Sequence, residues 1–169
     1  MLLFMSKRVA LVDPLAVVNG REVLFLRDVF GGEVPLSCPY PPLELAYAAS
    51  LLRAGGHTPD LVAANVLGLS HAAVVSRLRR DPPDIILVPS AWGSLDDDAR
   101  LLSLLREAFA DAVLLIPGPN VTAEPVAMLG RLPVNAIILG EPEEAVRMIA
   151  DGVGLSAVPN LAMRGHDGP

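Results

Sequence analysis

Three loops of glycine and small polar residues are the best candidates for chemistry in this chain. They read Ser90-Ala91-Trp92-Gly93-Ser94, Gly118-Pro119-Asn120-Val121-Thr122 and Gly140-Glu141, and each follows an apolar run. Hydroxyl and amide side chains can hydrogen-bond a ligand, and glycine lets the backbone approach it closely. Trp92, the only tryptophan, could stack on a flat ring system or simply pack under a neighbouring loop. The predicted ligand contacts are Ser90, Trp92, Ser94, Gly118, Pro119, Asn120, Val121, Gly140 and Glu141.

Each of these loops also has an ordinary structural explanation. The hydroxyl of Ser90 could cap the helix that follows, because serine is favoured at helix N-termini. Gly140 and Glu141 could mark no more than the end of a strand and the start of a helix. The series Gly118-Pro119-Asn120 is the stronger candidate, because a turn needs the glycine but does not need the whole series.

The elements that must position these loops alternate regularly along the chain. Five apolar runs, at residues 9–12, 61–64, 85–88, 112–116 and 136–139, are continuous, as is typical of strands covered on both faces of a parallel sheet. Helical patterns lie between and after them, at residues 43–54, 70–80, 94–109, 122–129 and 141–150. This order predicts a doubly wound, Rossmann-like α/β fold with a mostly parallel five-stranded sheet in the flavodoxin-like order 2-1-3-4-5. Ligands of such sheets bind at the carboxyl ends of the strands, where the three loops fall.

Two segments depart from this alternation. Residues 13–41 form a connection much longer than a usual strand-to-helix loop, which is typical of functional or mobile segments. Its apolar stretch Val23-Leu24-Phe25-Leu26 could form a small extra strand or cover a ligand. Residues 152–169 are rich in glycine and proline and show no periodicity. We therefore expect one domain over residues 1–151, followed by a tail or the beginning of a linker.

Composition excludes several classes of function. A net charge of -6 and a pI near 4.9 argue against a nucleic-acid partner, which is usually met by a basic face. No apolar run approaches the roughly 20 residues that a membrane-spanning helix needs. Cys38 is the only cysteine, so this chain alone can form no internal disulfide, thiolate zinc site or iron–sulfur cluster. These features favour a cytoplasmic protein.

Several ligands and reactive groups are also disfavoured. No glycine-rich turn follows the first apolar run, and no GK[ST] phosphate loop occurs, so dinucleotides and polyphosphates are not expected. The run Asp96-Asp97-Asp98 is predicted to be a solvated first helical turn and not a metal site, because no histidine accompanies it. His57 is predicted to be structural, and His71 and His166 are expected at the surface. Cys38 has no identifiable base beside it, so it is not expected to act as a nucleophile.

Five stretches taken together resemble the cobalamin-binding domain that precedes the catalytic barrel of cobalamin-dependent radical S-adenosylmethionine enzymes. They are YPPLELAYAASLLRAGGH, PPDIILVPSAWGS, GPNVTAEP, NAIILGEPEEAV and VPNLAMRGHDG. Each stretch is weak evidence alone, but the five follow the order of that family and span nearly the whole chain. The chain departs from the family pattern at four positions: Glu44 and Pro117 stand in place of glycines, Asn120 in place of a common histidine, and Pro142 interrupts a Gly-Glu repeat.

The resemblance implies a module that holds cobalamin while a radical S-adenosylmethionine barrel, in cis or in trans, performs the chemistry. Related corrinoid domains carry Asp-x-His-x-x-Gly after the first strand, but here Leu15 stands at the histidine position. We therefore expect the cofactor to be bound base-off, with no histidine ligand to cobalt. No residue of this chain is expected to be catalytic, because the three-cysteine motif of the barrel is absent from it.

Two other hypotheses remain open at this stage. The chain could be a degenerate domain that has lost the cofactor and acts as an interaction partner of a separate catalytic chain. It could also be an unrelated flavodoxin-like protein that binds a small ligand.

Overall fold

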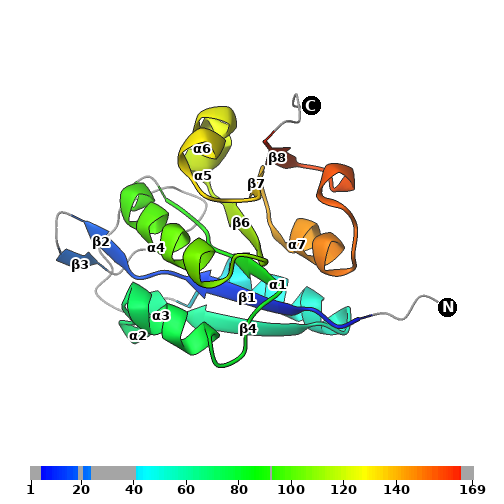
Figure 1. The fold of residues 1–169 in the computed structure, drawn as a ribbon, viewed down its shortest axis with the longest axis horizontal. Helices are drawn as coiled ribbons and strands as arrows, with labels where there is room; N and C mark the ends of the chain where they lie inside the picture. Colours follow the sequence, from blue (N-terminus) through cyan, green and yellow to red (C-terminus); the bar gives the residue numbers. More distant parts are fainter. Residues whose placement is uncertain (1–4, 19–20, 24–40, 92, 165–169) are drawn as a thin grey trace.

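A computed structural model describes residues 5–18, 21–23, 41–91 and 93–164 of the 169-residue chain. Its centre is a six-stranded sheet in the order β4-β1-β5-β6-β7-β8, with helices on both faces (Figure 1). Trp92, Cys38 and His166 lie outside the described residues, so the predictions made for them stay predictions.

Five strands of the sheet are parallel. They are β1 (Arg8–Asp13), β4 (Thr58–Ala63), β5 (Ile85–Leu87), β6 (Val113–Pro117) and β7 (Ala136–Ile138). Numbered along the chain, they have the order 2-1-3-4-5, so the predicted doubly wound sheet is confirmed. Their carboxyl ends therefore meet at one edge, which we call the rim.

The sixth strand comes from the segment expected to be a tail or linker. β8 (Leu161–Met163) follows a short 3-10 helix, η1 (Leu155–Ala157), and pairs antiparallel with β7. The guanidinium of Arg164 then donates hydrogen bonds to the carbonyl oxygens of Leu129 and Leu132, at 2.7 to 3.0 Å. Three half-buried residues at a sheet edge are too short a pattern for sequence periodicity to detect.

A separate two-stranded unit lies in the long connection after β1. β2 (Ala16–Val18) and β3 (Arg21–Val23) pair antiparallel, and β2 approaches helix α4 (Leu95–Ala108). The apolar stretch at residues 23–26 therefore contributes only Val23 to a described strand; residues 24–26 lie outside the described part.

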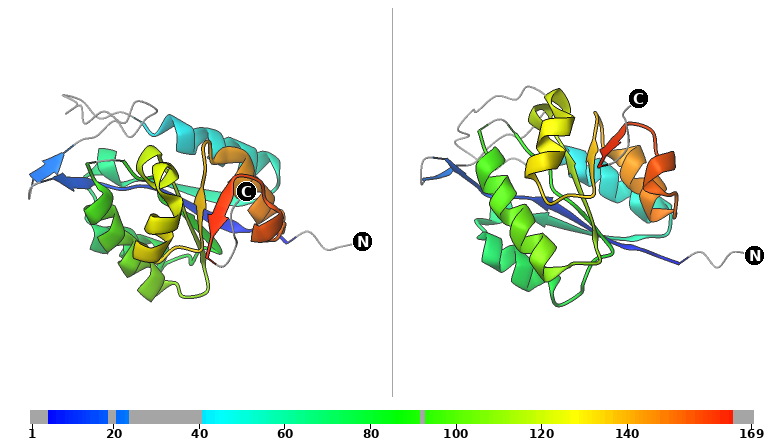
Figure 2. Two further views of the ribbon diagram at one scale, coloured as in Figure 1. Left: turned by 90° about the horizontal axis from the view of Figure 1, so that it is seen from above. Right: turned by 45° about the horizontal axis from the view of Figure 1, so that its top comes forward.

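The remaining helices divide between the two faces of the sheet, as Figures 1 and 2 show. One face is covered by α1 (Leu43–Ala54) and α7 (Glu143–Ala150). The opposite face is covered by α3 (His71–Leu78), α4, α5 (Pro119–Ala123) and α6 (Pro125–Arg131), with the short α2 (Ala64–Leu67) beside them.

Each face has its own hydrophobic core. Val12, Ile86 and Ile116 point toward α3 and α4, while Leu11 and Leu87 point toward α1 and α7. Because successive residues of a strand face opposite sides, a sheet covered on both faces needs continuous apolar strands. Burying each such leucine or isoleucine contributes roughly 1.5–3 kcal/mol. This double burial explains the positive mean hydropathy of a chain in which no helix of the described part is long and apolar enough to cross a bilayer.

The edge strand β4 differs from its prediction. It begins at Thr58, three residues before the apolar run, and gives way to α2 at Ala64. β4 pairs with β1 on one side only, so its first residues remain partly exposed and tolerate polar side chains. The continuous apolar run in the sequence therefore coincides with only the second half of β4.

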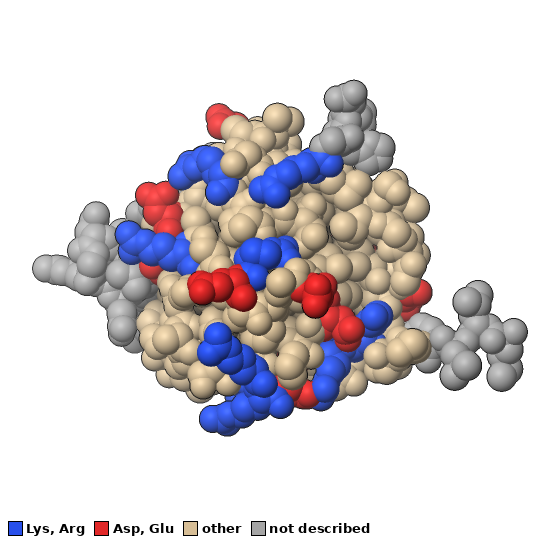
Figure 3. Space-filling model, viewed as in Figure 1, with Lys and Arg blue, Asp and Glu red and all other residues tan. Residues whose placement is uncertain are grey.

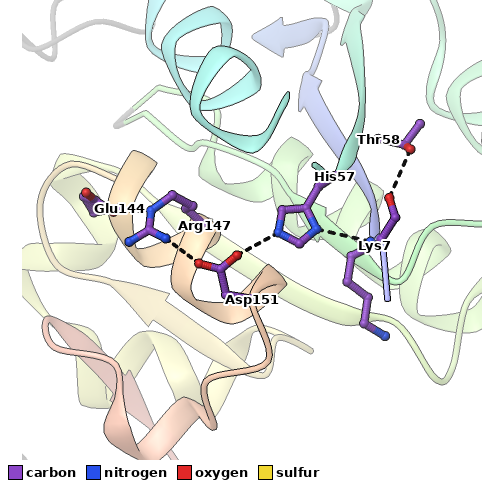
Figure 4. Close-up of polar contacts among 7 residues, drawn as sticks. Lys7, His57, Thr58, Glu144, Arg147 and Asp151 are labelled. Atoms are coloured by element: carbon purple, nitrogen blue, oxygen red, sulfur yellow. Dashed lines mark hydrogen bonds and ion pairs between the residues drawn. The ribbon is translucent and has the colours of Figure 1, made fainter. Parts of the chain in front are cut away.

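His57 lies at the amino edge of the sheet, opposite the rim, and its predicted structural role is confirmed (Figure 4). Its buried ring accepts a hydrogen bond at Nδ1 from the backbone N–H of Lys7 (3.2 Å). Its Nε2 lies 2.9 Å from a carboxylate oxygen of Asp151, which also pairs with Arg147. Because Nδ1 accepts, Nε2 carries the proton and donates to Asp151. The ring thus ties the start of β4 to the end of α7.

Candidate functional site

The loops predicted to bind a ligand meet at the rim. Ser90 lies three residues beyond the end of β5, Gly118 directly follows β6, and Gly140 follows β7 by two residues. The loops after β5 and β6 are joined directly, because the backbone N–H of Ser90 donates to the carbonyl oxygen of Pro117 at 3.0 Å. Parallel pairing therefore brings together residues that are 22 to 50 positions apart in sequence.

A buried hydrogen-bond network lies beneath this rim. The hydroxyls of Ser90 and Ser94 donate to the same carboxylate oxygen of Asp98, at 2.8 and 2.7 Å. Asn120 donates from Nδ2 to Ser90 Oγ and to the carbonyl oxygen of Ala91, both at 2.9 Å. Its Oδ1 accepts the backbone N–H of Val121 at 2.9 Å. The network connects the loop after β5, the start of α4 and the start of α5.

Burial changes the meaning of these predicted ligand contacts. Ser90, Ser94 and Asn120 are all at least 98% buried, so they contact one another and not the surface. Val121 is fully buried in the core beneath α5. The accessible part of the rim is formed by partly or fully exposed neighbours, namely Ala91, Gly93, Gly118, Pro119, Gly140 and Glu141.

The interpretation of the aspartate run is wrong for two of its three members. Asp96 is solvated, with 88% of its side chain exposed, but Asp97 is buried and Asp98 is completely buried. The reason is helical geometry, because successive residues of a turn point in different directions and α4 packs its first turn under the rim. His71, expected at the surface, is mostly buried, and its Nε2 lies 3.2 Å from Asp97.

The sequence also indicated that no histidine lies near the aspartates, and the pairing of His71 with Asp97 shows that this expectation is wrong. His71 comes from the start of α3, which lies beside α4, so tertiary packing supplies what sequence proximity does not. Across the described residues, no three histidine, cysteine or acidic side chains are grouped closely enough to hold a metal ion.

Two glycines of the rim have different structural reasons. Gly118 has φ 138° and ψ 157°, a conformation open essentially to glycine alone, and a Cβ there would lie 2.1 Å from the carbonyl oxygen of Ser90. The protein's own loop packing therefore requires Gly118. Gly140 has φ 99°, and a Cβ there would meet nothing within 4 Å. Gly140 consequently borders open space beside the end of β7.

Glu44 adds an acidic group on the other side of the rim. It lies in the first turn of α1 and is partly buried. Burial, followed by the negative charges of Glu141, Glu143 and Asp13, raises the pKa of Glu44 to about 7. The sequence marks this residue as a departure from the family's glycine, but only the packing of α1 beside α7 brings the four acidic side chains near one another.

The face shown in Figure 3 carries basic and acidic side chains in alternation. Exposed ion pairs of the described residues include Arg77 with Asp60 at 2.7 Å and Arg131 with Asp96 at 3.2 Å. This face therefore presents a mixed surface and not an extended field of one sign.

No family model matches the chain. A curated relative, the anaerobic magnesium-protoporphyrin IX monomethyl ester cyclase of Rubrivivax gelatinosus, is 28% identical over 135 residues, which are 78% of this chain and 24% of the cyclase. The chain thus spans about a quarter of the length of that relative.

Solved structures match the fold over almost the whole chain. The cobalamin-dependent S-adenosylmethionine radical enzyme OxsB, with aqua-cobalamin and S-adenosylmethionine bound, has a TM-score of 0.75 and 17% identity, covering 98% of this chain and 22% of OxsB. The radical S-adenosylmethionine methyltransferase TsrM from Kitasatospora setae, bound to its tryptophan substrate and an analogue of S-adenosylmethionine, has a TM-score of 0.72 and 15% identity, covering 96% of this chain and 29% of TsrM. In fold, this chain is similar to a part of the cobalamin-dependent radical S-adenosylmethionine enzymes, the family that its sequence motifs resemble.

Proposed function

We propose that this chain is a cobalamin-binding module that holds the corrinoid at the rim for radical S-adenosylmethionine chemistry performed by a catalytic barrel, in cis or in trans. The observation that carries the proposal is the match in fold to OxsB, whose structure contains aqua-cobalamin, over 98% of this chain. When bound, the corrinoid would supply a cobalt centre for methyl transfer or related radical chemistry.

The residues of the rim fit the nucleotide tail of a corrinoid through their small size. Ala91, Gly93 and Gly118 are partly exposed and carry little or no side chain, and Gly140 borders open space. Backbone and small side chains of this kind let the nucleotide tail of a corrinoid approach closely. The corrinoid would be held by Ala91, Gly93, Gly118, Pro119, Gly140 and Glu141, with its nucleotide tail toward the loops after β5, β6 and β7. Trp92, outside the described residues, is proposed as a further contact.

We further propose that cobalt receives no histidine from this chain. Leu15 occupies the position at which related corrinoid domains carry their histidine, and its side chain is buried. Among the described histidines, His57 is engaged at the opposite edge of the sheet and His71 pairs with Asp97. The expected state is base-off, with the lower face of cobalt free of an axial nitrogen.

The direct test is binding of hydroxocobalamin to the purified chain, followed by removal of free cofactor on a desalting column. We expect the protein to retain about one corrinoid, visible by its absorbance. A colourless protein at cofactor concentrations well above those of the protein would contradict the proposal. A Gly140→Leu variant places a bulky side chain in the open space at the rim but also strains the backbone, because Gly140 has φ 99°. If its circular dichroism spectrum matches that of the unaltered chain, it is expected to retain less corrinoid.

A second candidate function is that of an interaction partner that has lost the cofactor. It is favoured by the burial of Ser90 and Asn120, whose side chains are hydrogen-bonded to each other. This alternative predicts that no corrinoid is retained and that the chain associates with a separate radical S-adenosylmethionine protein. The same desalting experiment therefore separates the two candidates.

A further inference from the structure

Asp98 occupies the centre of the buried network beneath the rim. Its side chain is fully buried, although it lies in the first turn of a helix that begins with three consecutive aspartates. One of its carboxylate oxygens accepts hydrogen bonds from two serine hydroxyls. Ser90 lies in the loop after β5, and Ser94 is the residue directly before α4. A buried carboxylate that accepts two short hydrogen bonds orders both donors strongly.

This arrangement fixes the direction of the Ser90 hydroxyl. A serine hydroxyl has a single proton, and that of Ser90 is donated to Asp98. Ser90 Oγ can therefore only accept from its other neighbours, and it accepts from Asn120 Nδ2 at 2.9 Å. The second proton of the same amide goes to the carbonyl oxygen of Ala91. The direction of each hydrogen bond therefore determines the direction of the next one. The series runs from α4 through the loop after β5 to the start of α5.

The accessible residues of the rim lie next to this hydrogen-bond network in sequence or bond to it directly. Ala91 belongs to the loop after β5 and receives Asn120, whereas Gly118 and Pro119 immediately precede Asn120 in the loop after β6. The close approach of Gly118 to the carbonyl oxygen of Ser90 depends on the same alignment of the two loops. The surface that a ligand would contact is therefore set by groups that the ligand does not touch.

We propose that Asp98 is a positioning residue of the corrinoid site: by accepting hydrogen bonds from the hydroxyls of Ser90 and Ser94, it aligns the loops after β5 and β6 for the nucleotide tail. This inference rests on the proposed function, since it names the group that prepares that site. Preorganised loops bind more tightly because binding no longer has to order them. The part of the ligand that contacts these loops, the nucleotide tail, is the part whose affinity depends on Asp98.

The test compares two ligands, hydroxocobalamin and cobinamide, which has the corrin ring but lacks the nucleotide tail. In Asp98→Asn we expect cobalamin to bind about tenfold more weakly, because both charge-assisted hydrogen bonds, from Ser90 and from Ser94, are weakened. Cobinamide should bind as it does to the unaltered chain. Asp96→Asn is the matched control, because it removes the same charge from the same turn at an exposed position, and it should leave both affinities unchanged.

A double-mutant cycle decides whether Asp98 acts through Ser90. Ser90→Ala should lower the affinity for cobalamin by a similar factor. Adding Asp98→Asn to that variant should cause little further loss of affinity. If Asp98→Asn does not fold, Ser90→Ala alone remains decisive, since an unchanged ratio of cobalamin to cobinamide affinity in that variant overturns the inference. Equal weakening of both ligands by Asp98→Asn would mean a purely structural role and would also overturn it.

The outcome for the unaltered chain separates this inference from the proposed function. If the chain binds neither ligand, the proposed function fails and the role of Asp98 fails with it. If it binds cobalamin and cobinamide equally well, the proposal of corrinoid binding is supported. In that case contacts between the nucleotide tail and these loops add nothing to the affinity, and the inference about Asp98 is overturned.

Discussion

The Cα of Gly118 lies so close to the backbone carbonyl of Ser90 that a Cβ at position 118 would be only 2.1 Å from the oxygen. Real Cβ atoms essentially never approach an oxygen this closely, and the φ of 138° adds strain for any residue with a side chain. Gly118→Ala must therefore move one of the two loops. We expect it to lower the free energy of unfolding by about 3 kcal/mol or more, since strain and a backbone clash act together.

The matched control for this change is Gly130→Ala. Gly130 lies within α6, is exposed, and would place its Cβ in open space. In a helix this substitution should be neutral or stabilising by about 0.5–1 kcal/mol. Urea unfolding followed by circular dichroism measures both effects. A Gly118→Ala protein as stable as Gly130→Ala would show that the loops are not in the contact described.

Glu44 predicts a pH dependence of stability. Its pKa is raised from 4.5 to about 7 in the folded protein, so between these values the folded state binds more protons than the unfolded state. The stability contributed by this group is therefore full below about pH 4.5 and is lost as the pH rises through about 7. Glu44→Gln should consequently stabilise the protein above pH 7 by roughly 2 kcal/mol, allowing for partial solvent screening.

The measurement is urea unfolding of Glu44→Gln and the unaltered protein from pH 4 to pH 8. The difference in the free energy of unfolding should grow through this range and level off at the upper end. Glu107→Gln, which removes an exposed carboxylate from α4, should show no comparable trend. A constant difference between the Glu44 variant and the unaltered protein would contradict the raised pKa.

His57→Phe tests the tie between β4 and α7. Phenylalanine keeps a ring in the buried position but removes the bonds to Lys7 and Asp151. Losing two bonds at a buried ring should destabilise the protein by about 2 kcal/mol. Asp60→Asn, which weakens the exposed pair with Arg77, should change stability by less than about 1 kcal/mol. Equal effects of the two substitutions would refute a special role for His57.

The electron paramagnetic resonance spectrum of bound cob(II)alamin tests the coordination proposed for cobalt. An axial nitrogen splits the cobalt lines through its nuclear spin, whereas a base-off centre without histidine shows no such splitting. We expect the unsplit spectrum in the unaltered chain and the same spectrum in His71→Ala. Nitrogen splitting would refute the base-off, histidine-free state, and its loss in His71→Ala would identify His71 as the ligand.

Sequence periodicity was sufficient for the main architecture because the parallel strands are buried on both faces. The runs at residues 85–88 and 112–116 are continuous and apolar, and they became β5 and β6 nearly unchanged. The signal failed where strands lie at an edge: β4 begins in polar residues, and β8 is three half-buried residues long. Edge strands bury less surface, so their sequences carry a weaker pattern.

The sequence by itself determined which loops reach the rim, because parallel strands place their carboxyl ends on one edge and small residues follow three of them. Only the tertiary structure decided what those residues do. Ser90 and Asn120 are 30 positions apart, and nothing in their spacing indicates that they bond to each other and to Asp98 beneath the surface. These side chains become buried and acquire their hydrogen-bond partners when α4 and α5 pack on the sheet. Such long-range contacts leave no local periodic pattern in the sequence.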